Sequence, residues 1–168
     1  MSRSTKIPVS GLPDVRQSRR RLADILGGKK REEFPLSVVL MDLDRFKLFN
    51  DGLGHVEGDR VLGRVGALLE VIGERYRAPI YHWSDQYWAI LTHTDTPGAE
   101  RFVQEVKEGL KGLQIKYRHP EVKWIADTLV SITAGIATTS DMNADSAQLL
   151  KAADADLSHN KEKRVRNS

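Results

Sequence analysis

Residues 42–62 read DLDRFKLFNDGLGHVEGDRVL and directly follow the apolar run LSVVLM at residues 36–41. A mostly apolar, β-branched run predicts a buried strand, which places Asp42 and Asp44 at its end. Side chains two residues apart on a strand point to the same side of the sheet. Carboxylates at a strand end, followed by the amides of a helix start, suit a magnesium ion that carries a nucleotide triphosphate. The alternative is that one aspartate caps the helix and the other is solvated.

The rest of the chain alternates helical and extended patterns around this strand. Apolar residues at helical spacing predict helices at 14–27, 45–50, 56–76, 97–112 and 147–159, with Asp51-Gly52 and Gly54 ending the second. Extended patterns predict a hairpin at 80–92, a short strand at 114–117 and a further strand at 129–137. This order predicts an α/β domain with helices packed on a sheet that contains antiparallel strands.

Composition indicates one compact domain over residues 1–168, 40% hydrophobic and 29% charged. The chain has no cysteine, which excludes a disulfide framework, a thiolate metal site and a thiol nucleophile. No apolar run approaches the roughly 20 residues of a membrane span, and the N-terminus lacks the apolar stretch of a signal peptide. We therefore expect a cytoplasmic protein with no membrane span.

The positive charges lie at the two ends of the chain. Residues 1–31 carry nine Lys/Arg and two acids, and residues 159–168 carry four and one. Between them, 13 basic residues face 20 acidic ones. This acidic body argues against a basic groove for nucleic acid. The basic ends are interpreted as solvated helix faces, with a docking surface for anionic ligands as the alternative.

Residues 81–91 read YHWSDQYWAIL, in which two apolar and aromatic arms flank the polar pair Ser84-Asp85. This pattern predicts a β-hairpin. Two interpretations of Trp83 and Trp88 stay open: cross-strand packing, or an aromatic surface for a purine or a protein.

At residues 42–62 the chain resembles the GGDEF domain of diguanylate cyclases, whose pattern is DxDxFKxxND followed by GHxxGDxxL. Three further stretches are similar to the family. They are SGLPDVR at 10–16 (TGLPNRR in the family), VSITAGIA at 130–137 (VTxSIGIA) and ADADLSHNK at 153–161 (ADxALYxAK). The resemblance spans residues 10–167.

The resemblance implies a fold like the palm domain of nucleotidyl cyclases. Such a domain has a central mixed antiparallel sheet of about five strands plus the hairpin, surrounded by helices. Active members bind GTP with magnesium and, as a two-fold pair of domains, condense two GTP molecules to cyclic di-GMP in bacterial signalling.

The resemblance also implies roles for individual residues. Asp42 would bind the metal by its carboxylate and Leu43 by its backbone carbonyl. Guanine would be hydrogen-bonded by Asn50 and Asp59. The backbone amides around Arg45 and Phe46, together with the adjacent Lys47, would receive the phosphates. Lys161 would pair with these phosphates. Alternatively, Asn50 is a helix C-cap and Asp59 a first-turn residue favoured by the helix dipole.

The chain departs from the family at the hairpin. Alignment of Ala89-Ile90-Leu91 with the family's AIL places Ser84-Asp85-Gln86-Tyr87-Trp88 opposite the five signature residues. Gln86 then stands where a carboxylate should bind the metal, and Tyr87 where a glutamate should stand. Neither side chain supplies negative charge near neutral pH. Asp85 is one residue too early to replace the lost acid and, on strand alternation, would point differently unless the register shifts.

Two further departures concern ligand-binding residues. The product-inhibition motif RxxD corresponds to Arg75 and Ala78, so its acid is absent and cyclic di-GMP should bind weakly there. The family's closing GRN reads Arg164-Val165-Arg166-Asn167, which leaves the second phosphate-binding residue open by one position.

We therefore expect a degenerate, catalytically inactive GGDEF domain that acts as a regulatory module. It would sense GTP, with weakly bound Mg²⁺, or contact a protein partner that the sequence does not identify. Cyclic di-GMP is a second candidate ligand, and formation of a homodimer is left open. One alternative is residual cyclase or GTP-hydrolysing activity from Asp42, Asp44 and Asp85. Another is a protein scaffold that binds no nucleotide.

Overall fold

The computed structural model describes residues 11–116 and 129–166. Within these residues, four strands form one antiparallel sheet in the order β2-β3-β1-β4. They are β1 (Leu36–Leu43), β2 (Ile80–Trp83), β3 (Gln86–Leu91) and β4 (Ile132–Thr139). In the described part of the chain the sheet therefore has four strands rather than the expected five or so plus the hairpin, because the hairpin itself supplies two of the four. Of the expected strand at 114–117, the described part makes only an isolated bridge between Lys116 and Leu129, and residue 117 lies outside the described residues.

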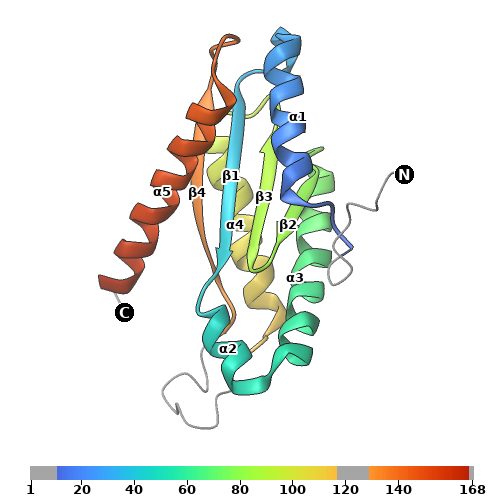
Figure 1. Cartoon of the computed structure of the whole chain (residues 1–168), viewed down its shortest axis with the longest axis vertical. Helices are drawn as coiled ribbons and strands as arrows, with labels where there is room; N and C mark the ends of the chain where they lie inside the picture. Colours follow the sequence, from blue (N-terminus) through green and yellow to red (C-terminus); the bar gives the residue numbers. More distant parts are fainter. Residues whose placement is uncertain (1–10, 117–128, 167–168) are drawn as a thin grey trace.

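Helices cover both faces of the sheet (Figure 1). They are α1 (Val15–Gly28), α2 (Phe46–Leu53), α3 (His55–Arg75), α4 (Thr96–Leu113) and α5 (Ser146–Arg166), with a short 3₁₀ helix at Arg31–Glu33. The pair α1 and α5 lies on one face, and α3 and α4 lie on the other. None of the helices in the described part of the chain is long and apolar enough to cross a membrane.

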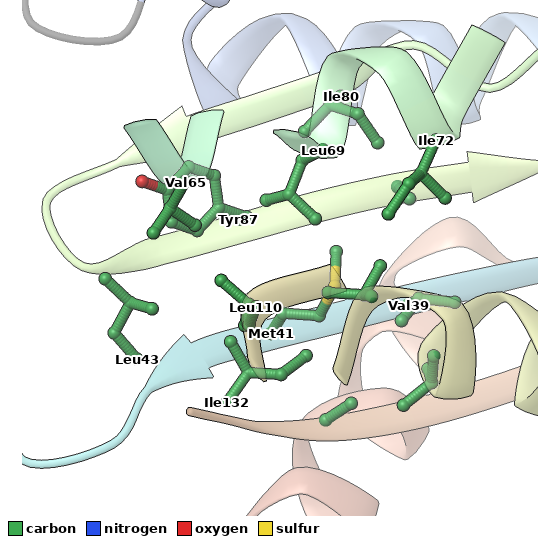
Figure 2. Packing of buried hydrophobic residues seen from close by; sticks show 14 of the residues in the cluster. Val39, Met41, Leu43, Val65, Leu69, Ile72, Ile80, Tyr87, Leu110 and Ile132 are labelled. Carbon is green, nitrogen blue, oxygen red and sulfur yellow. The ribbon is translucent and has the colours of Figure 1, made fainter. Parts of the chain in front are cut away.

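The central strand β1 is buried along its whole length. Its odd-numbered residues, such as Val39 and Met41, join the larger core beneath α3 and α4, which Figure 2 shows from close by. Its even-numbered residues, such as Val38 and Leu40, join the second core beneath α1 and α5. Because both faces are covered, the strand reads as a continuous apolar run rather than as an alternating one.

Several elements differ from the predicted bounds. Helix α2 continues through Asp51-Gly52 to Leu53 and ends only at Gly54, whose φ of 85° and ψ of 169° form a backbone conformation that favours glycine. Helix α5 continues past His159 to Arg166, because basic residues are good helix formers and suit the negative end of the helix dipole. Strand β4 is shifted from 129–137 to Ile132–Thr139.

Helix α5 packs directly on the backbone of β4 at Gly135. A Cβ atom at this position would lie 2.6 Å from the Cβ of Leu157 and would overlap the backbone carbonyl oxygen of Ala153. Both helix residues are buried. The absence of a side chain at Gly135 therefore sets how closely helix and strand approach.

The hairpin is anchored by a buried histidine. The imidazole of His82 stacks on the ring of Tyr87, with centroids 4.3 Å apart and an interplanar angle of 3°. Its Nε2 atom hydrogen-bonds the carbonyl of Ser84, and its backbone N–H donates to the carbonyl of Pro13 at 2.9 Å. Burial lowers the pKa of His82 below its usual value, and the bond to Ser84 opposes this only in part.

Gly135→Ala should lower the free energy of unfolding by about 2 kcal/mol, because α5 must move away from β4 to accept the methyl group. Urea unfolding measures the change. Gly112→Ala is the matched control, since a Cβ there meets nothing within 4 Å and lies inside α4. That control should be neutral or stabilising, and equal effects of the two substitutions would contradict the packing argument.

The free energy of unfolding should fall as the pH is lowered from about 7.5 to 5.5, because unfolded His82 binds a proton near its ordinary pKa of about 6.5 and the buried form resists it. His82→Phe keeps an aromatic ring against Tyr87 and removes the titrating group. Urea unfolding across this pH range should give a smaller slope for the variant than for the wild type. Equal slopes would show that His82 does not carry this pH dependence.

Candidate nucleotide site

The predicted metal-binding residues come from one end of the sheet, where β1 ends, the hairpin turns and β4 begins (Figure 1). Asp42 stands opposite Gln86 in the register between β1 and β3. Its Oδ2 atom forms an ion pair with Nζ of Lys161 from α5. Its Oδ1 atom is buried and has no hydrogen-bond partner among the described residues. One carboxylate oxygen of Asp42 is thus still available as an acceptor.

Asp44 lies just beyond the end of β1 and is fully engaged. Its carboxylate accepts hydrogen bonds of 2.6 Å from the hydroxyls of Ser131 and Thr133, and Nε of Arg164 lies 3.3 Å from Oδ1. These contacts tie the end of β1 to the start of β4 and to α5. Asp44 therefore holds the site together. The two hydroxyl partners were not predicted from the sequence, because they lie 87 and 89 residues away in the chain.

The start of α2 lies next to these aspartates. Arg45 has a φ of 57° and occupies the N-cap position, and among the described residues its side chain makes no capping hydrogen bond to the first-turn amides. Phe46 is buried and stacks on Phe49 with ring centroids 6.3 Å apart, whereas Lys47 is exposed. Uncapped amides at a helix start are suited to an anionic group such as phosphate.

The two predicted guanine-binding residues lie on either side of the turn between α2 and α3. Asn50 is half-buried, and its Oδ1 atom has no hydrogen-bond partner in the described part of the chain. This oxygen lies against Gly58, where an added Cβ would overlap it. Asp59 is exposed in the first turns of α3. The glycine at position 58 therefore makes room for the Asn50 amide.

The hairpin turn persists without its glycines. Ser84 adopts a φ of 57°, a conformation that favours glycine. Gln86 faces the same side of the sheet as Trp88, and its Oε1 atom accepts a hydrogen bond of 3.0 Å from the Trp88 indole. The guanidinium of Arg19 lies 5.5 Å from the centroid of Trp88, which is buried, whereas Trp83 is 55% exposed. Trp88 is thus packed against its neighbours, and its indole N–H donates a hydrogen bond to the side-chain oxygen of Gln86.

Tyr87 faces the opposite side of the sheet from Gln86. It is buried in the larger core beneath α3, beside Val65 in Figure 2. Its hydroxyl donates a hydrogen bond of 2.9 Å to the carbonyl of Leu62. Burial raises the pKa of Tyr87 far above its usual value. Gln86 and Tyr87 therefore lie on opposite faces of β3. Tyr87 packs in the larger core and hydrogen-bonds to α3.

Asp85 is half-buried in the hairpin turn, beside the end of β1. Its backbone carbonyl accepts a hydrogen bond of 3.0 Å from the N–H of Leu43. Burial, and next the negative charge of Asp42, raise the pKa of the Asp85 carboxyl, while the charge of Lys161 acts in the other direction. Even so, the described residues contain no cluster of three or more acidic or imidazole side chains arranged to hold a metal ion.

The structure also places the residues aligned with the product-inhibition motif and the closing basic residues. Arg75 pairs with Glu105 of α4 at 3.5 Å, and Ala78 is buried. At the end of α5, Arg164 reaches Asp44, whereas Arg166 pairs with Glu162 at the surface. Of these two arginines, Arg164 faces the site, and Asn167 lies outside the described residues.

The same fold occurs in solved structures. The GGDEF domain of DgcB from Caulobacter crescentus, in complex with c-di-GMP, matches with a TM-score of 0.82 and 17% identity over 97% of this chain and 93% of that one. Diguanylate cyclase SiaD from Pseudomonas aeruginosa, in complex with its activator SiaC, matches with a TM-score of 0.79 and 24% identity over 95% of this chain and 59% of that one.

Sequence comparison points to the same family. Diguanylate cyclase VdcA from Vibrio cholerae is 24% identical over 68% of this chain, which spans 32% of that protein. Signaling protein YkoW from Bacillus subtilis is 29% identical over 87% of this chain, which spans 18% of that protein. The family model described as "Diguanylate cyclase, GGDEF domain" matches residues 8–167. The chain therefore belongs to the GGDEF domain family.

Proposed function

We propose that this GGDEF domain is a regulatory module of cyclic di-GMP signalling that binds a guanine nucleotide and does not condense it. The observation that carries the proposal is the pairing of Asp42 with Gln86. On the face of the sheet where the family places a second metal-binding carboxylate, this chain has a neutral amide whose oxygen is held by Trp88.

Retained binding is supported by two buried oxygens that lack a hydrogen-bond partner among the described residues, Oδ1 of Asp42 and Oδ1 of Asn50. A buried acceptor without a partner is destabilising, so a ligand that supplies a cation or a donor gains by occupying it. Guanine offers donors that suit the Asn50 amide. The uncapped start of α2 would receive phosphates.

Magnesium fits this site only in part. The free oxygen of Asp42 and the backbone carbonyl of Leu43 are the hard oxygen ligands that magnesium prefers. When bound, the ion would offset phosphate charge. Lys161 already pairs with the other oxygen of Asp42, so this ammonium competes with the metal for the same carboxylate.

Loss of condensation is supported by the charges that remain. One preorganised electrostatic contact is typically worth about 10²- to 10³-fold in rate. Gln86 supplies no charge, and Asp44 is engaged by two hydroxyls and Arg164. The alternative of residual cyclase or GTP-hydrolysing activity would therefore depend on Asp42 and the half-buried Asp85.

A protein partner and cyclic di-GMP are suggested only by what the similar solved structures contain. The SiaD structure contains an activator protein, and the DgcB structure contains c-di-GMP. In this chain Ala78 provides no acid for product binding, and Arg75 is paired with Glu105. GTP is therefore the proposed ligand, and a scaffold that binds no nucleotide is the alternative.

Isothermal titration of the full chain with GTP and Mg²⁺ should give saturable binding, and Asn50→Ala should weaken it about tenfold or more, because a hydrogen-bond partner of guanine is lost. Asp51→Ala, an exposed neighbour on α2, is the matched control and should bind as the wild type does. No binding of GTP to the wild type would leave the scaffold alternative.

Incubation with GTP and Mg²⁺ or Mn²⁺, followed by chromatography, should yield no cyclic di-GMP or GDP above a protein-free reaction. Gln86→Glu returns a carboxylate opposite Asp42 and should tighten Mn²⁺ binding in the presence of GTP, measured by electron paramagnetic resonance. Gln104→Glu, the same change at an exposed position of α4, should leave Mn²⁺ binding unchanged. Steady product formation by the wild type would contradict the non-enzymatic role.

A further inference from the structure

Strand β4 is the last strand in the order β2-β3-β1-β4, so one of its edges pairs with no further strand among the described residues. Unpaired strand edges invite the addition of another strand, either from a partner or from a second copy of the chain. A hollow of about 570 Å³ lies beside this edge, between α4, β4 and α5.

Two side chains of α5 occupy backbone groups at this edge. Oδ2 of Asp156 accepts a hydrogen bond of 2.8 Å from the backbone N–H of Ile136. Nδ2 of Asn160 donates one of 2.8 Å to the backbone carbonyl of Ala134. These are an N–H donor and a C=O acceptor of the kind that an added strand would use.

The spacing of helix and strand makes these contacts repeat. Four helical residues advance about 6.0 Å, and two strand residues advance about 6.6 Å, so the two periods nearly match. Asp156 and Asn160 are four apart and reach strand residues two apart. One further turn along, Arg164 reaches Asp44, which is bonded to Ser131 and Thr133.

The short side chains reach the edge because α5 lies so close to β4 at Gly135, the residue between Ala134 and Ile136. In the family pattern ADxALYxAK, both positions 156 and 160 are alanine. An alanine could make neither hydrogen bond. The contacts therefore depend on two residues in which this chain departs from its family's pattern.

We propose that Asp156 and Asn160 form an edge clamp, which occupies backbone groups of β4 and closes this edge to strand addition by a second copy of the chain. The clamp is independent of nucleotide binding. It leaves the other surfaces of the domain open to protein partners, and it excludes an interface built by pairing one β4 with another.

The test uses the full chain with Asp156→Ala/Asn160→Ala. Alanine is the best helix former, so α5 should persist, which circular dichroism checks. The Ile136 amide should exchange with solvent about tenfold faster or more, because it loses a hydrogen bond to a charged acceptor. Sedimentation velocity over a concentration series should show self-association beyond that of the wild type.

Asp154→Ala/Ser158→Ala is the matched control, since these two exposed residues have the same spacing on the same helix. It should change neither readout. Asp156→Asn keeps an acceptor oxygen and should retain most of the Ile136 protection. Unchanged exchange of the Ile136 amide in the double variant would overturn the clamp, and so would sedimentation identical to that of the wild type.

Discussion

The position of β1 at the centre of the sheet is the constraint on which the site depends. Its antiparallel pairing with β3 places Asp42 opposite Gln86, and its pairing with β4 places Asp42 opposite Thr133. Both faces of β1 are covered, so a shift of one residue would bury Asp42 in the larger core and expose apolar residues to the polar end of the sheet. The register that stabilises the two cores is thus the same register that decides which hairpin residue faces the carboxylate.

Helix α5 provides the positive charge for this carboxylate end of the sheet. Its close approach at Gly135 fixes its height and rotation on β4, and Lys161 and Arg164 then reach Asp42 and Asp44. Because two hydroxyls and Arg164 engage Asp44, Asp42 is the one of these two aspartates whose carboxylate keeps a buried oxygen without a hydrogen-bond partner in the described part of the chain. The two aspartates that look equivalent in sequence therefore have different roles.

The sequence predicted the family, the positions of all five α-helices and the hairpin, because these depend on local periodicity and on a long motif match. It did not predict the strand count, since a bridge at Lys116 and a full strand have the same local pattern. From the sequence, Gln86 and Tyr87 were also expected to act alike, each as the loss of one negative charge from the site. The structure separates them onto opposite faces of β3, because neighbours on a strand alternate and Tyr87 faces α3. The hydrogen bond from the N–H of Leu43 to the carbonyl of Asp85 likewise depends on the turn geometry at Ser84, which local pattern does not reveal.

The substitution of Gln86 changes which ion this end of the sheet is suited to hold. Asp42 and the half-buried Asp85 face one ammonium group, that of Lys161, and burial favours the neutral form of Asp85. The ammonium of Lys161 already offsets the charge of Asp42 without a metal ion. A divalent cation placed beside Asp42 would add two positive charges that the neutral amide of Gln86 does not offset, so the negative charge of a bound triphosphate would favour its binding. In the proposed function, magnesium is therefore expected to bind together with the nucleotide, and the amide at position 86 makes that joint binding weaker than a carboxylate would.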